Sequence, residues 1–276
     1  MSAGDARFHL RVQRYGWDLA TETYAGGWVP VLLRHAVACV DKLGLAPGER
    51  VLDVATGPGT AAFLAAERVG PGGVVVGTDI AEKMVRLAQA QADARGLTQM
   101  SFRRTDMESP VLDADSFDAA LCVFGLMFAA DMGAAVRELY RVVRPGGRVS
   151  VVVWGRRAHC GWAEVFPIVD RQVTSDVCPM FFSLGGPGAM EAALARAGFG
   201  DVREERDSGF LDWPDAAAAI DSILVGGAVA LAYNKFAPDV RARVRDELAA
   251  SIAGHRHGDG YRIPAEFVFG TARKPG

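Results

Sequence analysis

The chain has 276 residues, of which half are hydrophobic and 23% are charged. This composition is typical of globular proteins and excludes disordered, collagen-like and coiled-coil chains, and the length fits one or two domains. Thirty basic and 33 acidic residues give a formal net charge of −3, so the basic surface of a nucleic-acid-binding protein is not expected.

The cysteines and the apolar stretches indicate the cellular compartment of the protein. The four cysteines lie far apart, without the spacing of a zinc site, and we expect Cys39 and Cys122 to be buried free thiols. The first ten residues lack the apolar region of a signal peptide. No apolar stretch reaches the roughly 20 residues that a membrane span needs. We therefore expect a cytoplasmic protein without a membrane span.

Strands and helices are predicted to alternate from residue 29 onward, with glycine and proline turns between them. Short apolar runs predict strands at 50–54, 73–78, 100–104, 117–123 and 148–154, and helical spacing predicts helices at 29–43, 60–69, 81–94 and 132–143. This alternation predicts an α/β protein with a doubly wound, mostly parallel, Rossmann-like sheet. Ligands of such sheets bind at the carboxyl ends of the strands.

The pattern loosens after residue 154. A helix is predicted at 188–197, and late strands at 202–206 and 266–271 bring the sheet to seven strands. About sixty mostly helical residues lie between these two strands, around 215–232 and 238–253. We expect this insert to be a helical cap over the active site, with residues 8–27 as a second wall. The alternative is a dimerisation arm.

The glycine-rich turn after the first predicted strand is the first candidate site. Gly57, Gly59 and Ala62 satisfy the loose G-x-G-x-x-G/A pattern, so an NAD-type Rossmann site is one hypothesis. Asp53 comes just before this turn, where a carboxylate would repel a pyrophosphate bound at the following helix N-terminus. S-adenosylmethionine has no phosphate and carries cationic sulfonium and ammonium groups. Asp53 therefore favours S-adenosylmethionine as the cofactor.

Two further acids end the next two predicted strands. Asp79 ends the second strand, where a carboxylate can accept both ribose hydroxyls, and Ile80 and Met84 follow it as apolar neighbours for adenine. Asp106 and Met107 end the third strand, where the carboxylate can accept the adenine amino group while the methionine packs on the ring. The alternative reading of Asp79 and Asp106 is that each is a helix N-cap.

The motifs between residues 50 and 154 resemble one known family. They are VLDVATGPG at 51–59, GTDI at 77–80, TDME at 105–108, SFD at 116–118 with FGL at 124–126, and ELYRVVRPGG at 138–147. Together they resemble class I S-adenosylmethionine-dependent methyltransferases, and within that class the ubiquinone/menaquinone C-methyltransferases and their small-molecule relatives. The resemblance covers about 105 residues, is specific for the cofactor fold and says little about the substrate.

The resemblance implies a set of cofactor-binding residues. These are Asp53, Ala55, Gly57, Pro58 and Gly59 around the methionine part, Asp79 at the ribose, Asp106 and Met107 at the adenine, and Val123 and Phe124 beside the sulfonium. Tyr24, by analogy with small-molecule methyltransferases, would close over the cofactor. The chain also departs from the family. Ala55 stands where many members have glycine, Val123 replaces a small polar residue of the quinone branch, and the region beyond Trp154 differs from the quinone enzymes.

Methyl transfer from a sulfonium requires alignment of donor and acceptor and exclusion of water, and a general base assists hydroxyl or carbon nucleophiles. His159, which follows the fifth predicted strand, is the candidate catalytic residue. His35 lies in a predicted helix and is expected to be structural. His255 and His257 lie in a glycine-rich polar loop without a nearby third ligand, so no metal is expected.

The expected activity is transfer of a methyl group from S-adenosylmethionine, which leaves as S-adenosylhomocysteine, to a small, largely apolar or aromatic acceptor, with oxygen or carbon favoured as the acceptor atom. The alternatives are an NAD(P)-dependent oxidoreductase and a non-catalytic S-adenosylmethionine-binding protein. Four segments are predicted: an N-terminal helical segment closing over the cofactor (1–45), the methyltransferase core (46–210), a helical cap for the substrate or a homodimer (211–262), and the final strand with the tail (263–276).

Overall fold

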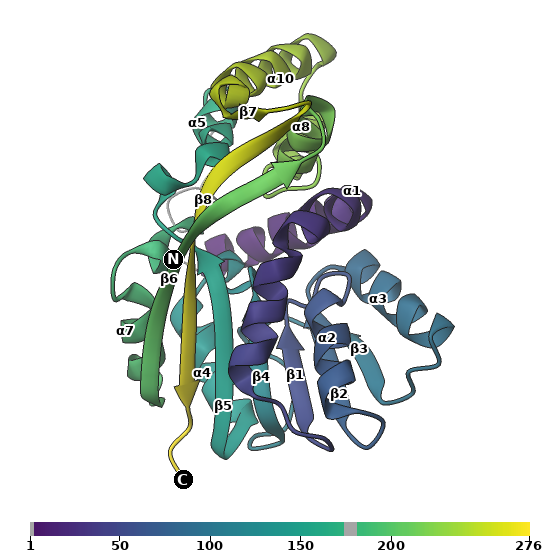
Figure 1. Ribbon diagram of the computed structural model, residues 1–276, viewed down its shortest axis with the longest axis vertical. Coiled ribbons are helices and arrows are strands. Elements are labelled where there is room, and N and C mark those ends of the chain that lie inside the picture. The colour runs from purple at the N-terminus through teal and green to yellow at the C-terminus, as the bar shows by residue number, and fades with distance from the viewer. Residues whose placement is uncertain (1–2, 174–180) are drawn as a thin grey trace.

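The predicted strands between residues 50 and 154 all form and lie in one sheet, within a computed structural model that describes residues 3–173 and 181–276 (Figure 1). The strands are β1 (Arg50–Val54), β2 (Val74–Asp79), β3 (Met100–Arg104), β4 (Phe117–Val123), β5 (Val143–Trp154), β6 (Gly200–Trp213), β7 (Arg256–His257) and β8 (Gly260–Arg273). Their order is β3-β2-β1-β4-β5-β8-β6, and β7 pairs with β8. The first five strands are parallel, and β8 runs antiparallel to β5, β6 and β7.

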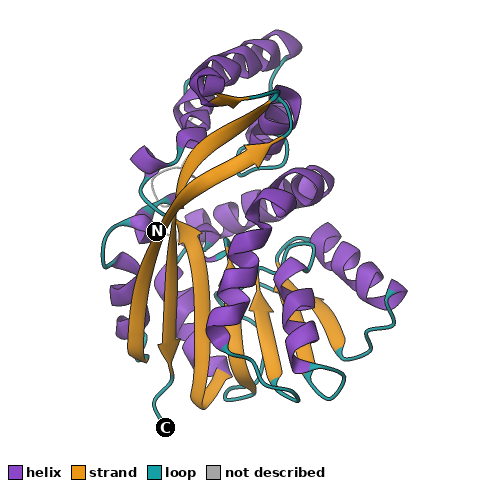
Figure 2. Cartoon of the chain, in the orientation of Figure 1, coloured by secondary structure: helices purple, strands orange, loops and turns teal. Residues whose placement is uncertain are grey.

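Helices cover both faces of the sheet and form the insert (Figure 2). They are α1 (Ala3–Leu43), α2 (Thr60–Val69), α3 (Glu82–Ala94), α4 (Met132–Val142), α5 (Val165–Asp170), α7 (Ala189–Arg196), α8 (Ala216–Leu224), α9 (Ala230–Lys235) and α10 (Pro238–Ile252). The doubly wound α/β prediction is therefore confirmed. None of the described helices is long and apolar enough to cross a membrane.

The predicted count of seven strands is one too low. In the described parts of the chain the sheet has eight strands, because Arg256 and His257 form the short strand β7, which pairs back onto Tyr261 and Gly260 of β8. The glycine-rich segment that was expected to be a polar loop is therefore a tight hairpin. Its positive-φ residue is Gly258 (φ 61°), a backbone conformation that glycine adopts without steric cost.

Helix α1 is longer than predicted. Apolar spacing predicted a helix only from residue 29, within an N-terminal helical segment of residues 1–45. One helix runs from Ala3 to Leu43, although Gly26, Gly27 and Pro30 inside it disfavour a helix interior. The helix crosses the upper edge of the sheet and then changes direction and descends along one face (Figure 1). Packing against the sheet and the insert outweighs the weak local propensity of this segment.

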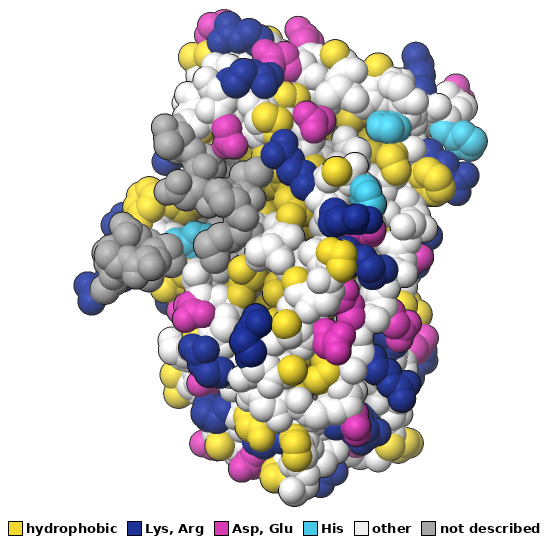
Figure 3. Space-filling model, turned by 90° about the vertical axis from the view of Figure 1, so that its left-hand side faces the viewer, with side chains coloured by type: hydrophobic (Ala, Val, Ile, Leu, Met, Phe, Trp, Pro, Cys, Tyr) yellow, Lys and Arg dark blue, Asp and Glu magenta, His cyan; other side chains and the backbone are white. Residues whose placement is uncertain are grey.

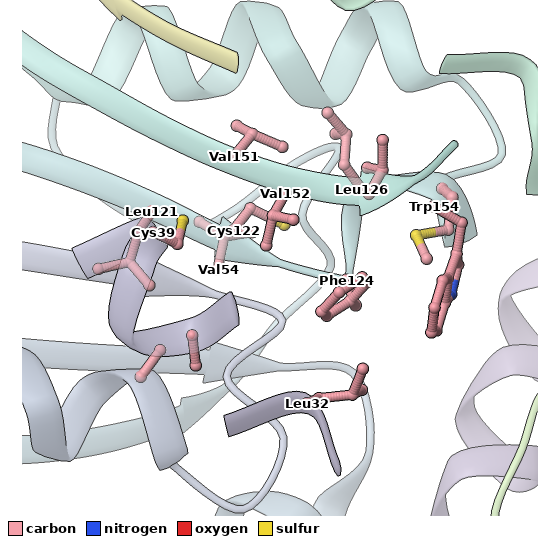
Figure 4. Close-up of a cluster of buried hydrophobic side chains, with 14 of the residues drawn as sticks. Leu32, Cys39, Val54, Leu121, Cys122, Phe124, Leu126, Val151, Val152 and Trp154 are labelled. Atoms are coloured by element: carbon pink, nitrogen blue, oxygen red, sulfur yellow. The ribbon is translucent and has the colours of Figure 1, made fainter. Parts of the chain in front are cut away.

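The second half of α1 packs on the strands at the centre of the sheet. Cys39 of α1 lies beside Cys122 of β4 in the buried cluster drawn in Figure 4. Both thiols are free and buried, as predicted. Cys39 Sγ lies 3.1 Å from Ser150 Oγ of β5, and burial raises the pKa of the Cys39 thiol to about 12. These two cysteines therefore act as core residues.

The insert is attached to the sheet by an antiparallel ribbon. Strands β6 and β8 stay paired beyond the sheet, up to Trp213 opposite Tyr261, and the helices α8, α9 and α10 follow between them (Figure 1). This confirms a helical insert between the last two long strands. The predicted segment boundaries at residues 210 and 262 fall inside β6 and β8, because these two strands are longer than the apolar pattern indicated.

Candidate active site

A cavity of about 930 Å³ lies at the carboxyl ends of the central strands, where the strand order reverses between β1 and β4. Its lining includes every predicted cofactor-binding residue except Gly59, namely Tyr24, Asp53, Ala55, Gly57, Pro58, Asp79, Ile80, Met84, Asp106, Met107, Val123 and Phe124. The three aspartates predicted from separate strand ends therefore line one cavity, which we call the acidic cavity.

Gly59 shapes the turn next to the acidic cavity. Its φ is 91°, and a Cβ there would lie 2.8 Å from Phe63 Cε2 and 3.2 Å from Ala88 Cβ. Only glycine fits this position without displacing α2 or α3. Gly59 thus permits the turn that presents Gly57 and Pro58 to the cavity.

Asp53 places a buried carboxylate at the end of β1. Its Oδ2 accepts a hydrogen bond from Thr56 Oγ1 at 2.7 Å, and among the residues that the structure describes its Oδ1 has no hydrogen-bond partner. Burial raises the pKa of Asp53 to about 7. A buried carboxylate oxygen without a partner is costly, so this site suits a cationic or hydrogen-bond-donating ligand.

Asp79 connects the end of β2 to the glycine turn. Its Oδ2 accepts from the Gly57 N–H at 2.8 Å, and its Oδ1 accepts from the Ala81 N–H at 2.9 Å. Burial raises the pKa of Asp79 to about 6. The helix N-cap interpretation is wrong for this residue, since α3 begins at Glu82 with Ala81 as its N-cap.

Asp106 forms a local turn after β3. Its Oδ1 accepts from the Glu108 N–H at 2.9 Å, and Glu108 Oε1 in turn accepts from the Ala130 N–H at 2.5 Å. The N-cap interpretation is wrong here too, because residues 105–116 contain no helix. Glu108 was not predicted as a site residue, although it lines the same cavity. It fixes the segment after β3 against the loop after β4.

Two residues of the cavity wall have left-handed backbones. Ala55 has φ 55° and Phe124 has φ 54°, and each such conformation costs a residue with a side chain on the order of 1–3 kcal/mol. A Cβ on Gly125 would overlap the Ala55 Cβ, so the loops after β1 and β4 touch at this point. The Phe124 N–H donates to the Val152 carbonyl at 2.8 Å, which holds the strained backbone in place.

Helix α1 closes the acidic cavity from the side opposite the sheet. Leu10, Gln13, Trp17 and Tyr24 line it, and of these only Tyr24 was predicted. Their spacing of three, four and seven residues lies on one face of a helix, but that signal requires a helix that starts before residue 10. The Tyr24 ring packs edge-on against Trp17 at 5.4 Å. Burial, together with the charges of Asp79 and Asp53, raises the pKa of Tyr24, so its hydroxyl stays protonated.

A second cavity of about 430 Å³ adjoins the first and is lined by apolar side chains. Four residues line both cavities: Trp17, Tyr24, Phe124 and Phe128. The remaining lining of this apolar cavity consists of Trp28, Leu32, Met127, Trp154, Trp162, Val165, Phe166, Phe181, Ile223, Gly227, Ala228 and Val229. No charged side chain belongs to this described lining. The apolar cavity therefore suits an uncharged, ring-bearing molecule.

His159 lies outside both cavities. Its Nδ1 is 2.9 Å from Glu266 Oε1, and it is not among the residues that line either cavity. Although burial opposes it, the hydrogen bonds from the Arg156 N–H and His159 lower the pKa of Glu266 to about 2. The prediction could not anticipate that β8 would bring Glu266 beside the end of β5.

Among the other histidines, His35 has a structural role. His35 is 2% exposed and stacks on Phe267 at 3.6 Å between ring centroids. Burial lowers its pKa to about 3, so the ring is neutral, and the structural prediction for His35 is confirmed. Across the described parts of the chain no group of three or more His, Cys, Asp or Glu side chains is arranged to hold a metal ion.

Comparison with known proteins gives the family. Residues 51–147 match the family described as "Methyltransferase domain". The chain is 35% identical over 250 residues to nocamycin O-methyltransferase of Saccharothrix syringae, across 83% of this chain and 88% of that protein. The chain belongs to the S-adenosylmethionine-dependent methyltransferases. Since it covers 83% of this chain, the similarity extends beyond the matched domain of residues 51–147.

Two further similarities concern the family branch and the fold of this methyltransferase. It is 33% identical over 171 residues to demethylmenaquinone methyltransferase of Thermus thermophilus, which covers 57% of this chain and 76% of that protein. The resemblance to the quinone branch is thus confirmed. The solved structure of the YcgJ protein of Bacillus subtilis superposes with a TM-score of 0.63 at 17% identity, over 88% of this chain and 99% of that one. At this identity the likeness concerns the fold alone.

Proposed function

We propose that this methyltransferase transfers the methyl group of S-adenosylmethionine to the oxygen or carbon of a small, apolar, ring-bearing acceptor. The observation that carries the proposal is the joining of the acidic cavity to the apolar cavity through four shared aromatic residues. A polar, cationic donor and an apolar acceptor need two such compartments in contact. The match to a protein named as an O-methyltransferase over 83% of the chain supports oxygen as the acceptor atom.

The acidic cavity fits the cofactor at its cationic end. Asp53 Oδ1 is buried without a partner in the described chain, and an ammonium or sulfonium group would supply the missing positive charge. Each Asp79 oxygen accepts one backbone hydrogen bond and retains capacity for a second, which suits the paired ribose hydroxyls. The same two carboxylates would repel a pyrophosphate, which disfavours the oxidoreductase alternative.

The adenine end of the cofactor would lie further along the same cavity. Met107, Ile80 and Met84 supply apolar contact for a flat ring, and Asp106 offers a carboxylate oxygen for the amino group. The Asp106 side chain is held in place by the Glu108 N–H.

When bound, the cofactor supplies a sulfonium that makes its methyl group electrophilic. The residues of this chain align donor and acceptor and exclude water, which accounts for most of what such a displacement requires. Phe124, which lines both cavities from a fixed left-handed backbone, separates the two ligands on the sheet side. Tyr24 and Trp17 of α1 cover the junction from the opposite side.

The molecular surface supports a small-molecule acceptor. Basic and acidic side chains are interspersed on the face that Figure 3 shows, and the formal net charge is −3. A nucleic-acid substrate would instead favour a continuous basic stripe. The apolar cavity offers the acceptor aromatic surface and no charge among its described lining.

The test is isothermal titration of the dialysed protein with S-adenosylhomocysteine, with NADH as the control. Binding of S-adenosylhomocysteine alone, in the micromolar range, supports the proposal, and binding of NADH instead would contradict it. Turnover of S-adenosylmethionine is then measured with a panel of phenols, quinols and amines. Cofactor binding without any turnover across the panel would favour the non-catalytic alternative.

A further inference from the structure

Trp28 lies where helix α1 meets the insert. It is 4% exposed, and its indole packs edge-to-face on three other indoles, with ring centroids 5.8 Å from Trp154, 5.5 Å from Trp162 and 5.3 Å from Trp213. Three of these four residues, Trp28, Trp154 and Trp162, line the apolar cavity. The orientation of Trp28 therefore sets the shape of the surface that faces an acceptor.

One residue of the insert holds this indole. Trp28 Nε1 donates to the Ser222 carbonyl at 2.6 Å, and Trp213 Nε1 donates to Ser222 Oγ at 3.1 Å. Ser222 is 1% exposed, and its hydroxyl donates to the Ala218 carbonyl at 2.6 Å. Ser222 thus fixes two indoles from different parts of the chain, one of them in the cavity wall.

The contact between α1 and α8 requires a glycine at position 27. A Cβ on Gly27 would overlap Ser222 Oγ and would lie 3.1 Å from Ser222 Cβ. The preceding Gly26 has no atom within 4 Å of its own Cβ position. The insert also approaches α1 closely at Gly226, where a Cβ would lie 3.0 Å from the backbone nitrogen of Tyr24. Helix α1 and the insert therefore touch backbone to backbone beside Trp28.

We propose that Trp28 is the specificity-determining residue for the acceptor and that Ser222 is its positioning residue. The Ser222 carbonyl fixes the plane of the Trp28 indole, and that plane seats a flat, uncharged ring system in the apolar cavity. Gly27 permits the approach that makes the hydrogen bond possible. The inference rests on the proposed function, because it takes the apolar cavity to be the acceptor site.

The adjacent glycines of α1 give a matched pair of variants. Gly27→Ala displaces Ser222 from Trp28, whereas Gly26→Ala adds the same methyl group to open space. Each protein is titrated with S-adenosylhomocysteine and then, when saturated, with two flat probes, 1-naphthol and 1-hydroxyanthraquinone. We expect both variants to bind S-adenosylhomocysteine within about twofold of the wild type, and Gly27→Ala alone to bind 1-hydroxyanthraquinone about tenfold more weakly.

Two readouts distinguish positioning from a merely structural role. A structural defect lowers the unfolding temperature without changing the ratio of the affinities for the two probes, whereas a displaced Trp28 changes that ratio. In the double variant Gly27→Ala/Ser222→Ala the overlapping Oγ is absent, so we expect part of the probe affinity to return. Probe affinities of Gly27→Ala that equal those of Gly26→Ala would overturn the inference.

A further variant covers the case in which Gly27→Ala does not fold. Trp28→Phe keeps an aromatic ring but removes the donor to Ser222 and part of the indole surface, so we expect at least the same loss of 1-hydroxyanthraquinone affinity, and unchanged affinity would overturn the inference. Wild-type protein that binds S-adenosylhomocysteine but neither probe would also overturn it. Failure of the wild type to bind S-adenosylhomocysteine at all would instead contradict the proposed function.

Discussion

The Asp79 carboxylate accepts a hydrogen bond from the Gly57 N–H at 2.8 Å, so the acid at the end of β2 holds the glycine turn that follows β1. The two residues are 22 positions apart in the chain, and Gly57 follows β1, the strand that pairs with β2. One side chain thereby orders the loop and offers its remaining acceptor capacity to the acidic cavity.

Asp79→Ala is expected to weaken S-adenosylhomocysteine binding by more than about tenfold, because the substitution removes the ribose acceptor and releases the Gly57 N–H. Isothermal titration measures the change. Asp41→Ala serves as the control, since the Asp41 carboxylate is half exposed beside Arg68 at the surface. Equal affinities of the two variants would contradict the assignment of Asp79.

The affinity for S-adenosylmethionine should depend on pH through the buried carboxylates. Burial raises the pKa of Asp53 to about 7 and that of Asp79 to about 6 in the ligand-free protein. A cationic ligand favours the ionised forms, so affinity should rise from pH 5.5 to pH 8 and then level off. Titrations across this range test the expectation. Asp53→Asn should flatten the profile, and an unchanged profile in that variant would point to other groups.

The stability of the ligand-free protein should show the opposite trend. A carboxyl group with a raised folded pKa binds more protons in the native state than in the unfolded state between the ordinary value of 3.8 and about 7. The stability that these groups contribute is thus fully present below the unfolded pKa and is lost as pH rises through the folded pKa. Thermal unfolding should show Asp53→Asn to be more stable than the wild type at pH 8 but not at pH 4. A constant difference between the two proteins would contradict this expectation.

Ala55→Gly is expected to stabilise the protein. The φ of 55° at Ala55 is a strained conformation for alanine, and glycine adopts it freely, for a gain of up to about 1 kcal/mol. In a chain of this length such a gain raises the unfolding temperature by roughly 2–4 °C. Ala66→Gly in the interior of α2 is the control and should lower it. A lower unfolding temperature for Ala55→Gly would show that the Cβ contact near Gly125 outweighs the strain.

His159→Gln should leave methyl transfer within about threefold of the wild type, because the ring pairs with Glu266 and lines neither described cavity. Loss of a general base would instead cost about 10²–10⁴-fold. Turnover with the acceptor found in the panel measures the difference. A hundredfold loss in a folded variant would restore the prediction that His159 is catalytic.

Three short parallel strands were the most predictable part of the fold. β1, β3 and β4 have the predicted bounds, because each is a short segment closed by turn residues. β6 and β8 were predicted too short, since most of their polar residues face solvent and their pairing partners are distant in the chain. Local patterns indicate buried strands well and long antiparallel ribbons poorly.

The site residues that could be predicted from the sequence lie at the ends of strands. Asp53, Asp79 and Asp106 end successive parallel strands, and the parallel sheet brings them to one edge. Gln13 and Trp17 were missed because their contribution depends on the path of α1 across that edge. The position of His159 depended on β8, which inserts next to β5 and supplies Glu266.

The paired strands β6 and β8 separate the helical insert from the part of the sheet whose strand ends carry the aspartates. The register of β8 on β5 is set between Phe267 and Arg273, within the sheet. Ile223 of α8 and Val229, which precedes α9, line the apolar cavity from the far end of the ribbon. Residues 214–259 can therefore change in length and sequence during evolution without shifting the strand ends that carry the aspartates.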